Sequence, residues 1–566
     1  MQNFAVLLIF VSITSWALVR DNALIKSSLP YKPGYVLVKT VDGASRDALD
    51  STAFSLGALL QKEFTLVPGL LLFEYDGAYD IQEIIDAFKA NNYVDYAEPD
   101  YYYHIATTND PRFREEWALE NTGQTGGTPD VDLNAHLMWQ IENGDPKVVI
   151  GVIDTGVDYS HADLMPNLLR NPAEIPANNI DDDSNGYVDD IFGINAINNS
   201  GKPLDDNAHG THVSGTIGAD GNNFIGISGV AQNIRIMSCK FLDANGSGST
   251  SDAIQCLQYF ANLKTRAKNP INIVATNNSW GSSSSSNALR DAIKAHEKLG
   301  ILFVAAAGNE AANNDISPSF PANYELSNII SVAATDHKDT LASFSNYGKR
   351  SVHVGAPGVR ILSTVLNQGY ALLSGTSMAT PHVTGLIAII KSAFPSLDAR
   401  QIKNLVLSSG VPISSLQNKS ISGRRIRGAD TNGRGALTCS HQLVNARLKP
   451  VANYLSIALG SSVLLSSLRL NCDAPNGTVN LYSDPQEILN LQDDGSNGDQ
   501  IAHDGVYSLL WTPLKAQTYT LNFGNGDSVL VNVSGINKST TSMHSTALYS
   551  SNTSKIPSDL PIISSK

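Results

Sequence analysis

The chain has 566 residues and carries 39 Lys plus Arg against 53 Asp plus Glu, for a net charge of −14 at pH 7. This acidic excess argues against nucleic acid as a partner. With 42% hydrophobic and 16% charged residues, the composition is that of a globular protein and excludes collagen-like and low-complexity classes.

The N-terminus carries a short apolar segment. Residues 4–11 are an unbroken apolar run, and Ser15 and Ala17 follow as small residues. Such a run is too short to cross about 30 Å of hydrocarbon, and the small residues form an acceptable cleavage pattern. We predict a signal peptide over residues 1–17, secretion to the extracellular space and no membrane span after its removal. A frayed apolar N-terminus is the alternative, because no Lys or Arg precedes the run.

Residues 30–104 alternate between strand-like and helix-like patterns. Apolar residues at Ile81, Ile84, Ile85 and Phe88 have the spacing of one helical face. The order strand, helix, strand, strand, helix, strand is typical of a ferredoxin-like α+β module of this length. The elements are expected at residues 35–39, 49–56, 58–64, 70–75, 81–88 and 94–97.

Residues 109–448 change to long apolar runs separated by helical patterns. Nearly continuous apolar runs are typical of strands that are covered on both faces, as in a parallel sheet. The intervening helices act as crossover connections, so we predict an α/β domain with a doubly wound, mostly parallel sheet. Strands are expected at 148–153, 234–237, 273–276 and 301–307, with helices at 253–263 and 289–299.

After Pro450 the apolar period falls to two. Short alternating runs separated by Gly, Asn, Asp and Pro predict a β-sandwich over residues 450–534. Its strands are expected at 478–482, 506–511, 519–523 and 529–533. Residues 535–566 are rich in Ser and Thr and are predicted to be a flexible tail.

Three segments of the α/β region each place a reactive side chain at a strand end or a helix start. Asp154 ends a buried strand, His209 lies on a turn that begins a helix, and Ser377 lies where Gly375 leads into an apolar helix. A serine hydroxyl needs a neutral imidazole to accept its proton during attack, and a carboxylate orients that imidazole. The helix start at Ser377 and the side chain of Asn309 are expected to supply donors to an oxyanion.

These signatures, in the order Asp, His, Ser, resemble those of the subtilisin-type serine endopeptidases over about residues 109–448. The resemblance implies a subtilisin-like fold, hydrolysis of peptide bonds through an acyl-enzyme, and polypeptide substrates. Residues 30–104 resemble the inhibitory propeptide of that family, so we expect a monomeric, self-processed zymogen that is cleaved near 101–104. The resemblance also implies that Ser279, Trp280 and Gly281 pair with the substrate backbone and that Ala307 and Gly308 form a pocket wall. Recognition through the main chain favours broad specificity.

Other functions were weighed against this interpretation. His209 and His212 lack the intervening Glu of a His-Glu-x-x-His metalloprotease, and the segment around Ser377 lacks the G-x-S-x-G elbow of lipases and esterases. Three alternatives stay open. They are a degenerate enzyme, a secreted binding protein with a protease-like scaffold, and a working protease whose C-terminal module guides it to its substrate.

The acidic segment 181–190 predicts a structural calcium site. It matches the D-x-[DN]-x-[DN]-G pattern of calcium loops, although the twelfth position is Phe192 rather than Glu. A solvated acidic loop held by Asx-turns is the alternative. The resemblance adds Asp163 as a ligand of another calcium. The candidate ligands are Asp181, Asp183, Asn185, Tyr187, Asp190 and Asp163.

Two further features are ambiguous. Asp493, Asp494, Asp499 and Asp504 lie in a Gly-rich segment that is interpreted as a turn, with calcium as the lesser alternative. The four cysteines, 239, 256, 439 and 472, form no C-x-x-C pair. Export allows a disulfide between Cys439 and Cys472, and four reduced thiols remain an equal alternative.

Overall fold

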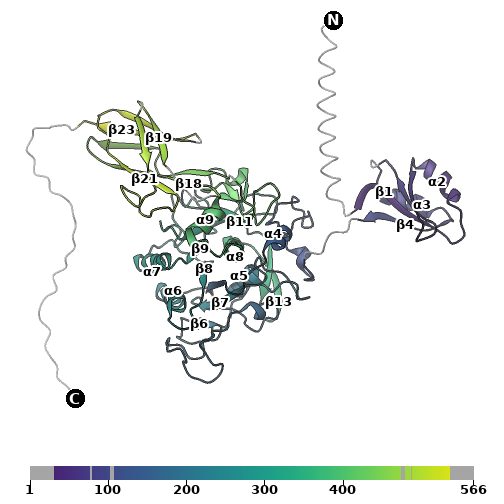
Figure 1. Cartoon of the computed structure of the whole chain (residues 1–566), viewed down its shortest axis with the longest axis horizontal. Coiled ribbons are helices and arrows are strands. Elements are labelled where there is room, and N and C mark those ends of the chain that lie inside the picture. Colours follow the sequence, from purple (N-terminus) through teal and green to yellow (C-terminus); the bar gives the residue numbers. More distant parts are fainter. Residues whose placement is uncertain are drawn as a thin grey trace, which may run out of the picture.

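The computed structural model describes residues 31–76, 79–101, 108–440, 442–472, 478–485, 487–524 and 526–535. The predicted signal peptide, and the predicted tail beyond residue 535, lie outside the described residues. Figure 1 shows an N-terminal module, a central α/β body and a C-terminal pair of sheets. In the described ranges, no helix has both the length and the apolar character needed to cross a membrane.

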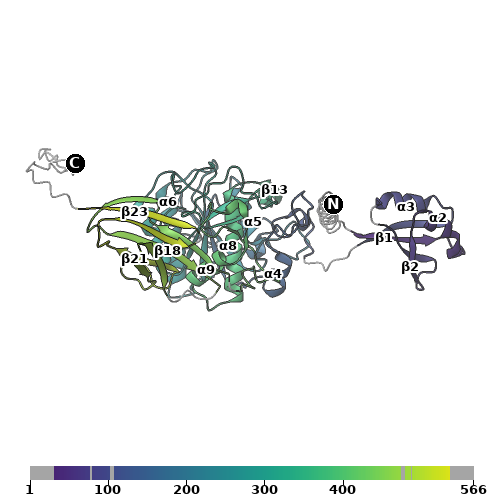
Figure 2. The same cartoon turned by 90° about the horizontal axis from the view of Figure 1, so that it is seen from above.

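The N-terminal module is one antiparallel sheet covered by helices. Its sheet has the order β2-β3-β1-β4. Val36, Phe73, Ile84 and Phe88 pack between the sheet and the helices. Figures 1 and 2 both show the module apart from the rest of the molecule. Along the chain its elements are β1 (Tyr31–Thr40), α2 (Asp50–Ser55), β2 (Leu59–Phe64), β3 (Leu70–Glu74), α3 (Ile81–Lys89) and β4 (Val94–Tyr101).

The central body is built on a nine-stranded sheet of order β14-β15-β11-β10-β9-β8-β5-β7-β6. All neighbouring strands are parallel except β14 and β15. The predicted mostly parallel α/β sheet is therefore confirmed. The strands are β5 (Val149–Asp154), β6 (Gly193–Asn195), β7 (Arg235–Lys240), β8 (Ile273–Asn278), β9 (Leu302–Ala306), β10 (Ile329–Thr335), β11 (Val354–Pro357), β14 (Val411–Pro412) and β15 (Arg424–Arg425).

Helices cover both faces of this sheet, which explains why its strands are apolar on both sides. In β5, Ile150 and Val152 face the larger core beneath α5 and α8, whereas Val149 and Ile153 face a second core beneath α6 and α7. A hairpin of β12 and β13 packs against α5. These elements are α4 (Ala135–Ile141), α5 (His209–Gly218), α6 (Thr250–Thr265), α7 (Asn287–Lys298), α8 (Thr376–Ala393), α9 (Ala399–Ser408), β12 (Ile361–Val365) and β13 (Gly369–Leu373).

The strand order changes direction at β5. The chain builds β7 and β6 on one side of β5, and then returns to build β8, β9, β10 and β11 on the other. In open parallel sheets, such a reversal leaves a crevice at the carboxyl ends of the central strands. The carboxyl ends of β5 and β8, two neighbouring central strands, therefore lie side by side.

The C-terminal region contains two facing sheets, with orders β16-β18-β21 and β17-β23-β22-β19-β20. Both contribute to one core that includes Leu465, Trp511, Leu521 and Val531. β16 lies within the range predicted for the α/β domain but pairs with β18, so this region begins at Val444. The strands are β16 (Val444–Lys449), β17 (Tyr454–Ala458), β18 (Val463–Leu470), β19 (Val479–Asp484), β20 (Glu487–Leu491), β21 (Val506–Trp511), β22 (Thr518–Gly524) and β23 (Asp527–Ser534).

Two disulfides join elements that are distant in the chain. Cys239 in β7 is bonded to Cys256 in α6, with a Cα–Cα distance of 5.6 Å. Cys439 is bonded to Cys472, just after β18, with a Cα–Cα distance of 5.7 Å. The first disulfide ties the sheet to a covering helix, and the second ties the α/β body to the C-terminal sheets.

Candidate active site

A carboxylate and an imidazole meet at the carboxyl end of β5. Asp154 is the last residue of this strand and is fully buried, and His209 is the first residue of α5. His209 Nδ1 lies 2.8 Å from Asp154 Oδ1, and Thr155 N donates to the same oxygen at 2.7 Å. The carboxylate therefore holds the proton on Nδ1 and leaves Nε2 of a neutral ring free to act as a base.

The environment of His209 favours its charged form. Burial lowers the pKa of the imidazole, but the charge of Asp154 and the hydrogen bond to it outweigh this effect, and Asp205 adds to them. The pKa of His209 is therefore raised above its usual value of about 6.5. The site thus stabilises the imidazolium that forms when the ring accepts a proton.

Ser377 is the second residue of α8 and lies near the end of β8. Its Oγ donates to the carbonyl oxygen of Ser279 at 3.1 Å, and Ser279 Oγ donates to the carbonyl oxygen of Ser377 at 2.9 Å. Among the described residues, no hydrogen bond joins Ser377 to His209. The structure thus joins Asp154 to His209 and anchors Ser377 on the segment that follows β8.

Asn309 follows β9 and contacts the same helix start. Its Oδ1 accepts from Thr376 N at 2.8 Å and from Thr376 Oγ1 at 3.0 Å. Because Oδ1 is the acceptor in both bonds, Asn309 Nδ2 is the atom that can donate. A point at the missing Cβ of Gly375 lies 3.6 Å from Ser377 N and 3.7 Å from both Nδ2 and Oδ1 of Asn309. The structure thus brings the Asn309 side chain to the start of the helix that carries Ser377.

The residues expected to bind substrate line the ends of the neighbouring strands. Trp280 Nε1 donates to the carbonyl oxygen of Ile153 at 3.0 Å, so this side chain supports the strand that ends in Asp154. Gly281 is exposed, and Ala307 is fully buried behind Gly308. Gly308 has φ of 114°, and a Cβ there would lie 2.3 Å from Asn346 Nδ2, so the position requires glycine.

An acidic cluster forms near α6. Carboxylate oxygens of Glu174, Asp183 and Asp190 all lie within 4.8 Å of one another. Burial raises the pKa of Asp190 to about 7, and the charge of Asp183 adds to this effect. Arg266 forms an ion pair with Asp183 at 2.8 Å, which supplies part of the compensating charge. Three oxygen donors around one point are the chemistry that a hard cation prefers.

Only part of the predicted ligand set belongs to this cluster. Asp183 and Asp190 do, and Asn185 Nδ2 donates to Asp190 at 3.0 Å. Asp181 instead accepts from the backbone N–H groups of Asn185 and Gly186, four and five residues further along the chain. The Tyr187 hydroxyl accepts from Gln255 at 2.8 Å.

Asp163 and Glu174 also differ from the predicted set of calcium ligands. Asp163 lies outside the cluster and accepts from Ile227 N, Asn223 Nδ2 and Tyr370 Oη. Glu174 belongs to the cluster but was not predicted, because it precedes the acidic run and no spacing rule connects it to that run. Only its acidic character was visible in the sequence.

A second acidic cluster lies in the C-terminal region. Asp493, Asp499 and Asp504 also place carboxylate oxygens within 4.8 Å of one another. Asp493 accepts from the backbone N–H groups of Asp504 and Gly505, which lie 11 and 12 residues further along the chain, so these contacts close the whole segment and are not those of a tight turn. Asp494, outside the cluster, accepts from Ser496 N two residues on, as in a turn.

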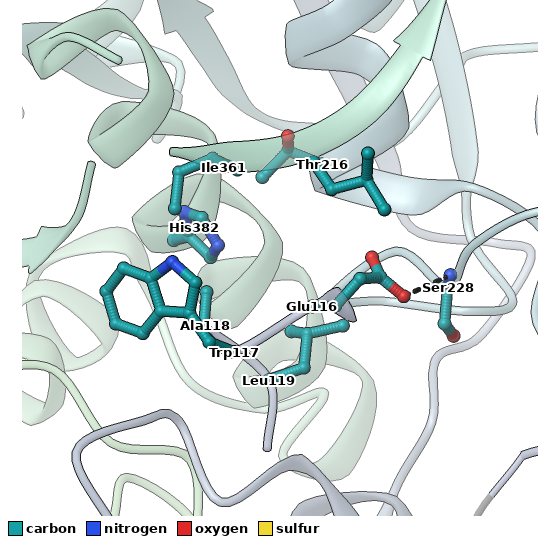
Figure 3. A pocket seen from close by; sticks show the side chains of 9 residues that line it. Glu116, Trp117, Ala118, Leu119, Thr216, Ser228, Ile361 and His382 are labelled. Atoms are coloured by element: carbon teal, nitrogen blue, oxygen red, sulfur yellow. Dashed lines mark hydrogen bonds between the residues drawn. The ribbon is translucent and has the colours of Figure 1, made fainter. Parts of the chain in front are cut away.

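The narrow pocket in Figure 3 is a separate feature. It is lined by Glu116, Trp117 and His382, among others, and has a volume of about 10 Å³, room for about one water molecule. Glu116 accepts from Ser228 N at 2.9 Å across it. None of Asp154, His209, Ser377 and Asn309 lines this pocket, so it is not a substrate site.

The chain is similar to known serine proteinases. The sequence model of the Subtilase family matches residues 145–435. The chain is 36% identical over 315 residues to a thermophilic serine proteinase of Bacillus sp. (strain AK1), covering 55% of this chain and 67% of the relative. It is 37% identical over 288 residues to subtilisin-like protease 1 of Plasmodium berghei (strain Anka), covering 48% of this chain and 47% of that protein.

A solved structure of a cold adapted subtilisin-like serine proteinase is also similar, with 30% sequence identity and a TM-score of 0.40. It covers 50% of this chain and 89% of that chain. The chain thus spans about two thirds of the Bacillus relative and about half of the Plasmodium relative.

Proposed function

The chain belongs to the subtilase family, a family of serine endopeptidases, and on this premise we propose that it cleaves polypeptides through Asp154, His209 and Ser377. The observation that carries this proposal is the 2.8 Å hydrogen bond between Asp154 and His209 at the start of α5. It lies at the crevice where the strand order reverses, with Ser377 and Asn309 at the neighbouring strand ends.

In the proposed reaction, the Ser377 hydroxyl leaves the Ser279 carbonyl by rotation about its Cα–Cβ bond and donates to His209 Nε2. Rotation between staggered positions is an ordinary change for a serine side chain. Ser377 Oγ then attacks the scissile carbonyl carbon while His209 accepts the proton, which it later gives to the leaving amine. The backbone N–H of Ser377 and the Asn309 amide donate to the oxyanion. Water releases the resulting acyl-enzyme by the reverse sequence.

We propose broad specificity, because the candidate substrate contacts are mainly backbone groups. Ser279, Trp280 and Gly281 offer an extended segment to which a peptide adds as a strand. The Trp280 side chain is already engaged with Ile153 and so supports the segment from behind. Gly308 would present a small, uncharged wall to the side chain before the scissile bond, with the buried Ala307 supporting it.

We propose that the protein is secreted as a zymogen. Residues 1–17 would act as the signal peptide, and the module at 30–104 as a ferredoxin-like inhibitory propeptide. The antiparallel order β2-β3-β1-β4 with two helices supports the second assignment. Processing is expected near residues 101–104. N-terminal sequencing of the secreted protein tests this, and a mature start outside Tyr101 to Arg114 contradicts it.

We propose a structural calcium ion at the cluster of Glu174, Asp183 and Asp190. Buried carboxylates that repel one another are stabilised by a divalent cation, and calcium accepts oxygen ligands in flexible geometry. The cluster lies away from His209 and Ser377 in the sequence and takes no part in the proposed chemistry. Its ion would stabilise the long loop between β5 and β6.

Hydrolysis of casein by the secreted wild type, by Ser377→Ala and by Ser374→Ala tests the proposed function. Ser374 lies three residues earlier, is exposed, and accepts only from Arg360 N among the described contacts. We expect loss of activity in Ser377→Ala and wild-type activity in Ser374→Ala. An inactive wild type, or a Ser377→Ala variant as active as wild type, overturns the proposal and favours a non-catalytic binding protein.

A further inference from the structure

A second buried carboxylate lies beside the pair of Asp154 and His209. Asp205 precedes α5 and is only 5% exposed. Its Oδ1 accepts from Thr155 Oγ1 at 2.8 Å, from Asn207 N at 2.9 Å and from Ala208 N at 3.1 Å. Its Oδ2 accepts from Thr211 N at 2.9 Å and from Thr211 Oγ1 at 2.6 Å. Five hydrogen bonds thus converge on one carboxylate.

These bonds connect the segments that carry Asp154 and His209. Thr155 follows Asp154, and its hydroxyl donates to Asp205 while it accepts from Gly210 N at 2.8 Å. Gly210 and Thr211 directly follow His209. Asp205 therefore ties the turn after β5 to the first turn of α5, so the two segments are held together by more than the bond between Asp154 and His209.

Asp205 also satisfies the helix start. The residue before α5 is Ala208, which has φ of 88° and no side chain able to accept from the first backbone N–H groups. Left-handed backbone is unfavourable for alanine, and unsatisfied N–H groups at a helix start need an acceptor. Asp205 accepts from Ala208 N and Thr211 N, and so takes the place of the missing N-cap side chain. The backbone that aims His209 depends on this carboxylate.

The charge of Asp205 acts on the same imidazole. Burial raises the pKa of Asp205, but the hydrogen bonds from Thr211, Asn207 and Thr155 outweigh this and lower it, so the group is ionised at neutral pH. Asp154 and Asp205 both raise the pKa of His209. Lys240 is a cation near this pair of carboxylates, and its Nζ donates to Thr155 O and to Asp206. His212 lies one turn further along α5, and burial lowers its pKa to about 4.

We propose that Asp205 is a positioning residue for His209 in peptide bond hydrolysis, which it serves by fixing the first turn of α5 against Thr155 and by placing a second negative charge near the imidazole. This inference rests on the proposed function of Asp154, His209 and Ser377. It assigns two carboxylates to one histidine: Asp154 contacts the ring, and Asp205 acts through the backbone and through space.

Asp205→Asn tests the proposal because it keeps the side-chain shape, removes the charge and turns an NH₂ group toward backbone donors. We expect kcat to fall by about 10- to 100-fold with little change in KM, as for small displacements of a catalytic group. The acidic limb of the profile of kcat/KM against pH should move to lower pH, because an imidazolium with less negative charge nearby loses its proton more readily.

Asp206→Asn is the matched control. It removes the same charge from the next residue, whose side chain is 53% exposed and pairs with Lys240 rather than with α5. We expect near wild-type kcat and an unmoved acidic limb in this variant. If kcat falls in Asp205→Asn but the acidic limb of the pH profile does not move, Asp205 has only a structural role and the proposal is overturned. The proposal is also overturned if kcat and the pH profile of Asp205→Asn equal those of the wild type.

Thr211→Val decides the question if Asp205→Asn fails to fold, as judged by circular dichroism. This substitution removes the hydrogen bond from Thr211 Oγ1 to Asp205, together with the acceptor of Asp158 N, and keeps the charge of Asp205. In folded protein we expect a several-fold loss of kcat, and an unchanged kcat overturns the proposal. Casein hydrolysis by the wild type and by Ser377→Ala tests the proposed function separately. If the wild type is active and Ser377→Ala is not, a negative result with Asp205→Asn contradicts only this inference.

Discussion

Arg447 in β16 donates to Asp527, at the start of β23, across 2.9 Å; the Arg447 side chain is fully buried and that of Asp527 is 13% exposed. Asp527 also pairs with Lys349 of the α/β body at 3.2 Å. Arg447 further donates to the carbonyl oxygens of Pro450 and Ala452. One carboxylate thus joins the α/β body, β16 and the hairpin of β22 and β23.

Replacement of Arg447 by alanine should therefore destabilise the C-terminal region strongly. It leaves two carbonyl groups without their donor and leaves Asp527 with Lys349 but without its buried partner, which typically costs about 1–3 kcal/mol. We expect a lower midpoint of thermal unfolding, measured by calorimetry. Lys449→Ala is the control, because its ion pair with Glu325 is exposed and should contribute about 0–1 kcal/mol. Equal effects of the two substitutions would contradict this assignment.

Asp154→Asn should lower kcat by about 10³- to 10⁴-fold. An amide in place of the carboxylate no longer holds the proton on Nδ1 of His209 and no longer stabilises the imidazolium. The measurement is single-turnover cleavage of a chromogenic peptide ester or amide. Activity within tenfold of wild type would show that Asp154 does not orient the base.

The pH dependence follows from the raised pKa of His209. The base must be neutral, so kcat/KM should rise with pH through the pKa of His209, and the midpoint of this rise should lie above about 6.5. The profile should be measured with an uncharged peptide substrate, so that titration of the substrate does not contribute. A midpoint at or below that value would mean that burial lowers the pKa of His209 more than Asp154 raises it.

Asn309→Ala should lower kcat by about 10²- to 10³-fold with a small change in KM, because the lost donor interacts with the oxyanion rather than with the ground state. Steady-state kinetics on a peptide amide separate the two constants. A large rise in KM with unchanged kcat would instead assign Asn309 to substrate binding.

Calcium should stabilise the protein more at pH 8 than at pH 5. Without the ion, the raised pKa of Asp190, about 7, means that the folded state holds a proton that the unfolded state has released, so stability falls as pH rises from about 4 to 7. An ion replaces that proton at higher pH. Thermal unfolding with calcium and with EDTA at both pH values measures the difference.

Glu174→Gln should reduce the calcium-dependent increase in the unfolding midpoint, since it removes one ligand charge from the cluster. Asp291→Asn is the control, because Asp291 lies exposed on α7 and pairs only with the neighbouring Arg290. An identical response to calcium in Glu174→Gln and wild type would place the ion elsewhere.

The chemistry and the secondary structure were visible in the sequence because both follow local patterns. The apolar run ending in Asp154 predicted β5, and the elements at 253–263 and 289–299 correspond to α6 and α7. The residue types that follow these strands pointed to Asp154 and His209, which form a hydrogen bond at the end of β5, and to Ser377, which is bonded to Ser279 instead. Burial of parallel strands on both faces leaves a continuous apolar signal, so the α/β class needed no tertiary information.

Contacts between distant segments were decided only by the tertiary structure. Glu174 joins Asp183 and Asp190, and Cys239 meets Cys256, although no spacing pattern relates these residues. β16 pairs with β18 rather than ending the α/β domain, because pairing depends on the partner strand and not on the strand's own residues.

Asp205 shows the same division at the active site. In the sequence it is one acidic residue in a polar loop, whereas in the structure it accepts from Thr155, Ala208 and Thr211 at once. The sequence by itself determined which residues carry the proposed chemistry, because reactive groups are recognisable from their type and local setting. The tertiary structure decided what holds them in place, because that support comes from chain segments brought together only when the sheet and helices pack.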